Sequence, residues 1–362
     1  MKMTRTSSRK QQHVNISLTK DVEFRSKSSG FDRWDFLHNA LPELNLSDID
    51  PSSVFLGKKI ALPIIISSMT GGYPKAVRIN QQLAEVCAHK KIVLGVGSQR
   101  QASENVRYHH SFSVVRETAP NIPIFGNIGA AEVSRLQDAS SIMRLIDLIQ
   151  ADGFAVHLNP LQELLQPEGD TNFRGVLDGI ALLVKSLPVP IIVKEIGAGI
   201  SADVARRLME VGVKIIDIAG AGGTSWAGVE ILRRRNGKGK IYRGDGTKGK
   251  KVKSSNAEIF WDWGIPTVDA LQSVCRLKSE SPSLKVIASG GISNGIDCAK
   301  SIALGADFTA SAMSILQALA NGGTETVIGL IDQWEWELKG VMFLTGSRSI
   351  AELQKQILYL RV

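Results

Sequence analysis

The sequence has no apolar run that approaches the roughly 18 residues of a membrane-spanning helix. Its start, Met1 to Lys10, is basic and polar and lacks the apolar stretch of a secretory signal peptide. We therefore expect a cytoplasmic protein without a membrane segment. Cysteine is also scarce. Cys87, Cys275 and Cys298 share no CxxC spacing and lie in stretches with helical patterning, so we expect free, buried thiols rather than a metal or catalytic site.

The charge balance is positive, with 43 Lys and Arg against 35 Asp and Glu in 362 residues. Ten of the basic residues fall between Arg233 and Lys253, a segment whose single acidic residue is Asp245. The rest of the chain then carries 33 basic and 34 acidic groups, so the excess charge is confined to one segment. That segment lacks the interleaved aromatic residues on which bases stack, and we expect no nucleic-acid partner.

Eight short apolar runs recur from about residue 60 onward, each followed by a turn rich in Gly, Ser or Asn and then by an amphipathic helical pattern. The runs are nearly all apolar rather than alternating, which is typical of parallel strands covered by helices. They begin near residues 60, 90, 121, 153, 190, 213, 284 and 305. Eight such units predict a TIM barrel, an α/β fold. A doubly wound sheet is disfavoured because no GxGxxG follows the first run.

Two segments fall outside this repeat, within what we expect to be a single domain over residues 1–362. Residues 1–59 form an N-terminal extension with a basic start. Residues 227–265 form an unusually long, polar and glycine-rich connection after the sixth run, and this connection contains RRRNGKGK. Because such a stretch buries little apolar surface, we expect a mobile loop over the barrel mouth that orders on ligand binding.

The chemistry of a TIM-barrel enzyme lies at the carboxyl ends of its strands. SGGISNG follows the seventh run and precedes a helix, and ASAMS ends the eighth run. Glycine turns that expose backbone N–H groups at helix starts suit a phosphate, although glycines needed only for turning the chain are the alternative. Ser, Thr and Asn after the first three runs would hydrogen-bond a planar heterocycle. Flavin mononucleotide (FMN) fits this arrangement.

Lys194 ends the otherwise apolar run PIIVK. It could neutralise Glu195, form a Schiff base, or lie against the ring of a reduced, anionic flavin, where a cation is stabilising.

After the fourth run, HLNPLQE places four polar groups together: His157, Asn159, Gln162 and Glu163. They could orient a substrate and hold one divalent ion through a single carboxylate and phosphate oxygens, or they could simply cap the strand end.

Basic groups near the expected mouth are Arg9, Lys10, His13 and Arg100. They could pair with an anionic substrate, but a solvated tail is an equally good interpretation of the first three.

Taken together, these motifs resemble the type 2 isopentenyl-diphosphate isomerases, which are FMN-containing barrels. The similarity covers nearly the whole chain and is carried by RKQQHV, SSMTGG, GVGSQR, GNIGA, HLNPLQE, VKEIGAGIS, AGAGGTSW, ASGGISNG and GADFTASAM, in that order. It implies interconversion of isopentenyl and dimethylallyl diphosphate with reduced FMN and no net redox change, Mg²⁺, and NADPH as the reductant. It also implies a homo-oligomer, a tetramer or octamer.

The resemblance also assigns roles to residues. The implied flavin contacts are Ser67, Ser68, Met69, Thr70, Ser98, Asn127, Lys194, Thr224, Gly290, Gly291, Ala312 and Met313. The implied substrate contacts are Arg9, Lys10, His13, Ser98, Gln99, Arg100, His157, Asn159 and Gln162, with Glu163 as the Mg²⁺ ligand. His157, Gln162 and Lys194 are the implied catalytic residues. One departure is Ala219, where many relatives have Ser.

The nearest alternative is an FMN-dependent 2-hydroxy acid oxidase or dehydrogenase on a similar barrel. Those enzymes need a histidine base and arginines for a carboxylate, typically in a His-Gly-Gly-Arg cluster after strand six. The sixth run here is followed by AGAGGTSW, which has neither residue type.

Overall fold

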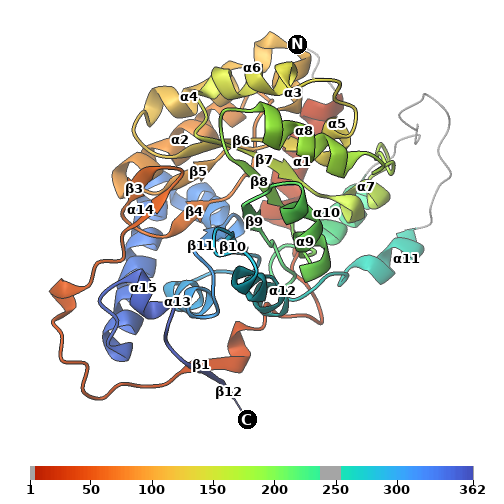
Figure 1. Ribbon diagram of the computed structural model, residues 1–362. Helices are drawn as coiled ribbons and strands as arrows, with labels where there is room; N and C mark the ends of the chain where they lie inside the picture. The colour runs from red at the N-terminus through yellow and green to blue at the C-terminus, as the bar shows by residue number, and fades with distance from the viewer. Residues whose placement is uncertain (1–4, 237–253, 362) are drawn as a thin grey trace.

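The eight apolar runs form the closed parallel barrel that the sequence predicts (Figure 1). The computed structural model describes residues 5–236 and 254–361. The strands follow one another around the barrel in chain order: β4 (Ile64–Ile66), β5 (Val93–Gly95), β6 (Ile124–Gly129), β7 (Gly153–His157), β8 (Ile191–Lys194), β9 (Ile215–Asp217), β10 (Lys285–Ser289) and β11 (Phe308–Ser311). β11 pairs with β4 in parallel and closes the ring.

Helices surround the strands and bury an apolar layer against them (Figure 1). The main helices outside the barrel are α2 (Ala76–Lys90), α4 (His110–Thr118), α6 (Ser140–Ile149), α8 (Val176–Ser186), α9 (Ala202–Glu210), α12 (Thr267–Cys275), α13 (Gly295–Ala303) and α14 (Met313–Thr345). Short helices at the strand tips and the chain end are α3 (Arg100–Glu104), α5 (Ala130–Val133), α7 (Pro160–Leu165) and α15 (Ile350–Leu353). The helical pattern that the sequence predicts after each of the eight runs is therefore confirmed.

The amino-terminal end of the barrel is closed by a hairpin from the N-terminal extension. Strands β2 (Ser53–Phe55) and β3 (Lys58–Ile60) pair antiparallel and insert Phe55 beneath the barrel interior. The Phe55 ring lies 4.8 Å from that of Phe308 and 6.4 Å from that of Phe125, centroid to centroid. A further pair, β1 (Trp34–Phe36) and β12 (Leu358–Leu360), joins the extension to the chain end. The hairpin therefore covers one end of the barrel, and the carboxyl ends of the strands lie at the other end.

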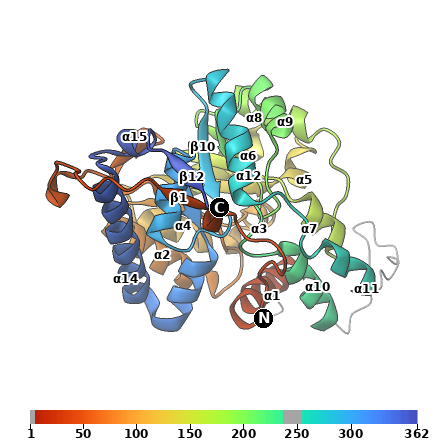
Figure 2. The same ribbon diagram turned by 90° about the horizontal axis from the view of Figure 1, so that it is seen from below.

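The region expected to be a mobile loop differs from that expectation at both of its ends. Residues Trp226–Asn236 form helix α10, and Ser254–Ala257 form the short helix α11. Val229 and Ile231 are fully buried, because α10 packs against α1 (Arg5–Thr19) and α7 (Figure 2). The most basic part of the predicted loop, residues 237–253, lies outside the described residues.

Helix α1 begins the described chain and lies against α10 at the mouth of the barrel (Figure 2). Helix α1, which carries Arg9, Lys10 and His13, is thus part of the structure around the mouth rather than a solvated tail. None of the described helices is long and apolar enough to span a membrane. Cys87 and Cys298 are buried, Cys275 is partly buried, and all three are free thiols, as the sequence predicts.

Candidate active site

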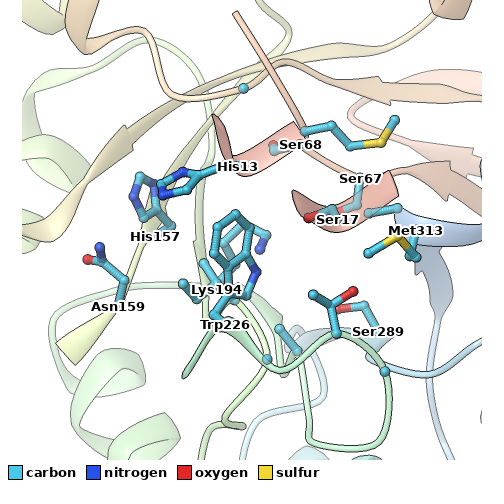
Figure 3. A pocket seen from close by; sticks show the side chains of 18 of the residues that line it. His13, Ser17, Ser67, Ser68, His157, Asn159, Lys194, Trp226, Ser289 and Met313 are labelled. Atoms are coloured by element: carbon cyan, nitrogen blue, oxygen red, sulfur yellow. The ribbon is translucent and has the colours of Figure 1, made fainter. Parts of the chain in front are cut away.

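One cavity of about 460 Å³ lies at the carboxyl ends of the strands, beneath α1 and α10 (Figure 3). Nearly all of the residues singled out in the sequence line it. They are Arg9, Lys10, His13, Ser67, Ser68, Met69, Thr70, Ser98, Arg100, Asn127, His157, Asn159, Gln162, Glu163, Lys194, Thr224, Gly290, Gly291, Ala312 and Met313. The sequence therefore identifies about half of the lining residues, although these residues are far apart along the chain.

Gln99 is the predicted site residue whose side chain lies outside the cavity lining. It is fully buried, its Nε2 donates to the Leu145 carbonyl at 3.0 Å, and its Oε1 accepts from the Asn127 N–H at 3.1 Å. The side chain points into the layer behind the strand tips rather than toward a substrate. Gln99 therefore holds the tip of β6 in place, and its side chain does not line the cavity.

The tips of β10 and β11 form a turn of small residues. Gly290 has φ of 104° and Gly291 has φ of 72°, and a Cβ at Gly290 would lie 2.1 Å from the Gly220 carbonyl oxygen. Only glycine fits there without a backbone shift. Ala312 is the N-cap of the long helix α14, which begins at Met313. Exposed backbone N–H groups and a helix start are the elements that bind a phosphate group.

The wall formed by β4 and β5 carries a hydroxyl without a partner. Ser68 Oγ is buried and has no hydrogen-bond partner among residues 5–236 and 254–361. Buried polar atoms are rarely left unpaired, so this atom points to a ligand group that completes it. The hydroxyl, the small-residue turn of β10 and β11, and Lys194 at the base of the cavity together fit FMN.

Lys194 is buried at the end of β8, and its Nζ donates to the backbone carbonyl of Glu195 at 2.5 Å. The carboxylate of Glu195 instead accepts from the N–H groups of residues 196, 197 and 198. Neutralisation of the Glu195 carboxylate is therefore not what Lys194 does. The carboxylate nearest to Nζ is Asp217, whose Oδ2 is 3.9 Å away and whose Oδ1 accepts from Ser289 Oγ. The Lys194 side chain thus has one close acceptor and one more distant carboxylate within the protein, and it lines the cavity.

His157 ends β7, and its Nδ1 lies 2.9 Å from Asn127 Oδ1. Since Oδ1 can only accept, Nδ1 carries the proton and Nε2 is left as an acceptor. Burial, with a further contribution from the charge of Lys194, lowers the pKa of His157 to about 3. The imidazole is therefore neutral near pH 7 and binds as a hydrogen-bonding group rather than as a cation.

Asn159, Gln162 and Glu163 surround the start of α7. The Asn159 Nδ2 donates to Gln162 Oε1 at 3.0 Å and to Glu163 Oε1 at 2.9 Å, and Glu163 Oε2 accepts from the Asp170 N–H at 2.7 Å. Burial raises the pKa of Glu163, although these hydrogen bonds act in the opposite direction. Among the described residues, no group of three or more His, Cys, Asp or Glu could hold a metal. Glu163 is therefore a single carboxylate at the cavity, held by Asn159 at the start of α7 and by the Asp170 N–H.

One face of α1 brings three basic side chains to the cavity: Arg9, Lys10 and His13. The Lys10 Nζ donates to the Ser98 carbonyl at 2.5 Å, and Arg9 Nη1 donates to Gln166 Oε1 at 3.4 Å. Burial, aided by the charge of Arg9, lowers the pKa of Lys10 to about 7. With Arg100 on the neighbouring wall, these residues make the mouth basic.

Two carboxylates at the site were not identified in the sequence. Glu230 on α10 is fully buried, and its Oε1 lies 2.9 Å from His13 Nε2 and 3.2 Å from Gln162 Nε2. Burial alone would raise its pKa, but His13 and Arg233 lower it to about 2. Glu132, on α5, pairs with Arg100 at 2.9 Å. The apolar spacing in WAGVEIL is a helical signal that could have located Glu230, whereas nothing in the sequence marks Glu132.

A closed parallel barrel with small-residue tips on its last two strands and a buried lysine at the cavity is the arrangement expected of an FMN-dependent barrel protein. The model of the FMN-dependent dehydrogenase family matches residues 159–360, more than half of the chain. A variant of flavocytochrome b2 with sulfite bound superposes with a TM-score of 0.68 at 16% identity, over 96% of this chain and 82% of that one, which shows the shared fold.

Curated relatives define the family more narrowly. An isopentenyl-diphosphate delta-isomerase of Pelodictyon phaeoclathratiforme is 49% identical over 98% of this chain and 97% of its own. One of Chlorobium phaeobacteroides is 47% identical over 98% and 96%. The chain belongs to the isopentenyl-diphosphate delta-isomerase family.

Proposed function

We propose that this protein interconverts isopentenyl and dimethylallyl diphosphate, using reduced FMN, with Mg²⁺ on the diphosphate. The observation that carries the proposal is the division of the cavity. The floor and one wall fit a flavin phosphate and ring, and the face covered by α1 is basic and fits a second phosphorylated ligand. A cavity with only the first feature would suit any flavoprotein of this fold.

The substrate diphosphate would be held by Arg9, Lys10 and Arg100, whose basic groups lie around the mouth, and by the imidazole of His13. Guanidinium and ammonium groups in a partly buried site make strong charge-assisted hydrogen bonds to phosphate. The Glu163 carboxylate would complete a Mg²⁺ site together with phosphate oxygens and water, which is how one protein carboxylate usually holds this ion.

Moving an unactivated double bond requires protonation of one carbon and removal of a proton from another, through a state with cationic character. Reduced FMN, when bound, supplies an electron-rich ring that stabilises such a state and a ring nitrogen that can exchange a proton. Lys194 would stabilise the anionic form of this ring from the cavity floor, since its Nζ approaches no carboxylate of the described residues closer than 3.9 Å.

The remaining residues position the substrate and exclude water. Neutral His157 and the amides of Asn159 and Gln162 present hydrogen-bonding groups in fixed orientations, because Asn127, Glu163 and Glu230 hold their other atoms. Gln162 is too weak an acid to supply the proton alone, so it would orient the reacting carbons. Helix α1 covers the mouth and limits access of water to the cationic state.

Further parts of the proposal are supported by the resemblance to type 2 isomerases. NADPH would reduce the flavin, the chain would assemble as a homo-oligomer, a tetramer or octamer, and the enzyme would act in the cytoplasm. A 2-hydroxy acid oxidase is the second candidate of the same barrel class. The tip of β9, from Ala219 to Trp226, offers neither a histidine base nor an arginine for a carboxylate.

The test is to purify the protein, record its absorbance before and after dithionite, and incubate the reduced form anaerobically with isopentenyl diphosphate. We expect a flavin spectrum that bleaches on reduction, followed by formation of dimethylallyl diphosphate. Absence of bound flavin, or absence of product from the reduced form, would overturn the proposal. Reduction of the flavin by a 2-hydroxy acid would instead favour the second candidate.

A further inference from the structure

Asp217 is a buried carboxylate at the end of β9, directly behind the cavity wall. It is 3% exposed and does not itself line the cavity. It contacts three residues that do line the cavity: Lys194 on β8, Ala219 after β9, and Ser289 on β10. One carboxylate therefore joins the tips of three neighbouring strands.

The two oxygens of Asp217 have different surroundings. Oδ1 accepts from Ser289 Oγ at 2.5 Å and from the Ala219 N–H at 3.2 Å, whereas Oδ2 lies 3.9 Å from Lys194 Nζ. Lys194 and Asp217 are partners in the parallel register of β8 and β9, so their side chains leave the sheet side by side. Burial raises the pKa of Asp217, and the charge of Lys194 and the two hydrogen bonds act in the opposite direction.

Lys194 needs an opposite charge because it is buried. Its close acceptor, the backbone carbonyl of Glu195, is neutral, and the Glu195 carboxylate is occupied by three backbone N–H groups. Among residues 5–236 and 254–361, Asp217 supplies the carboxylate within 4 Å of Nζ. Buried charges are normally paired, and removal of one partner leaves the other at a high cost in free energy.

We propose that Asp217 is the counter-ion of Lys194 and sets how strongly this lysine stabilises reduced FMN. It is a positioning residue, because it acts through Lys194 and not on the ring itself. An unpaired cation beside the ring would stabilise the reduced, anionic form most strongly and make it a poor proton acceptor. The carboxylate offsets part of this charge, so the reduced ring is stabilised but still accepts a proton. The inference rests on the proposed function, since it requires FMN against Lys194.

The first test uses the apoprotein and needs no flavin. Asp217→Asn keeps an oxygen for the Ser289 and Ala219 contacts but removes the charge. Asp217→Asn and Lys194→Met each leave one buried charge unpaired, whereas the double variant leaves none. We expect the double variant to be at least 10-fold more stable, as an equilibrium constant of unfolding in urea, than the sum of the two single losses predicts. An aspartate that only bonds Ser289 and Ala219 would give additive losses.

The second test measures the midpoint potential of bound FMN by spectroelectrochemistry. Asp217→Asn should raise the potential by about 30 mV, which corresponds to a 10-fold gain in affinity for reduced over oxidised FMN. Lys194→Met should lower the potential, because it removes the cation that stabilises the reduced form.

Asp152→Asn is the matched control for both tests. Asp152 is a largely buried carboxylate that pairs with Arg116 at 2.7 Å and with Lys58 at 2.6 Å, and it directly precedes β7, at the end of the barrel opposite the cavity. We expect this change to lower stability, to be additive with Lys194→Met, and to leave the FMN potential unchanged.

The outcomes separate this inference from the proposed function. If wild-type apoprotein binds no FMN, the proposed function is wrong, and the apoprotein comparison still tests the ion pair. If the losses of Asp217→Asn and Lys194→Met are additive, or if the potential of Asp217→Asn is unchanged or lowered, the role of Asp217 is overturned. If Asp217→Asn alone does not fold, the double variant should fold, and its failure to do so overturns the role as well. Non-additive losses together with a raised potential support it.

Discussion

Replacement of Glu230 by Gln tests the electrostatic contacts that hold α1 and α10 together above the cavity. The carboxylate is fully buried and receives Arg233 Nε at 2.7 Å as well as His13 and Gln162. Glutamine keeps the size of the side chain but removes its charge. Arg233 retains Glu168, to which both terminal nitrogens donate at 3.0 Å, so the change isolates the loss at Glu230.

The expected loss of folding free energy follows from the pKa of Glu230. The ordinary value of 4.5 falls to about 2 in the folded protein. This difference of about 2.5 units corresponds to about 3 kcal/mol of folding free energy near pH 7. Because the folded pKa of this acid is depressed, its contribution is present above about pH 4.5 and is lost as the pH falls through about 2. The difference between wild type and Glu230→Gln should then shrink on acidification.

Urea denaturation of wild type and Glu230→Gln at pH 7 and pH 3 measures this difference in the free energy of unfolding. We expect the variant to be about 3 kcal/mol less stable at pH 7 and to lose more than half of that deficit at pH 3. Glu104→Gln is the control, because Glu104 pairs with Arg100 at the surface and should contribute less than about 1 kcal/mol. A loss of stability in Glu230→Gln as small as that of the control, or one that does not change with pH, would show that the ionised Glu230 carboxylate does not stabilise the fold.

Three further predictions concern the ligands. Glu163→Gln should reduce activity at least 100-fold, because it would remove a transition-state contact worth about 3 kcal/mol, and added Mg²⁺ should restore little of it. Near wild-type turnover in a steady-state assay would exclude a role of Glu163 as a metal ligand. Lys194→Ala should slow isomerisation by reduced, flavin-loaded enzyme by about 10-fold or more, and an unchanged rate contradicts its electronic role. Lys10, with its pKa lowered to about 7 by burial and by Arg9, should take up a proton when a diphosphate binds, so affinity falls as pH rises above about 7. Calorimetry in two buffers of different ionisation enthalpy measures this uptake, and zero uptake refutes it.

The barrel could be predicted from the sequence because each strand is buried on both faces. A run such as PIIVK has no polar residue until its tip, and eight such runs leave few alternatives to a closed parallel sheet. The tips were identified by the same logic, since polar residues at the carboxyl ends of the strands meet at one end of the barrel.

Helix α10 escaped prediction because its apolar turn is short and three arginines follow it directly. Its stability comes from packing against α1 and α7, which are remote in sequence. Gln99 illustrates a second limit. Its position after the second run predicts a side chain in the cavity, but its amide bonds to the Leu145 carbonyl and the Asn127 N–H behind the strand tips.

In the proposed reaction the flavin acts in its reduced form without net electron transfer. Enzyme reduced with stoichiometric dithionite under anaerobic conditions and given excess isopentenyl diphosphate tests this most directly, with the flavin spectrum and the product followed together. We predict many molecules of dimethylallyl diphosphate per flavin while the spectrum stays reduced. Formation of only one product molecule per flavin, with reoxidation of the flavin as the product forms, would instead show net electron transfer from the flavin.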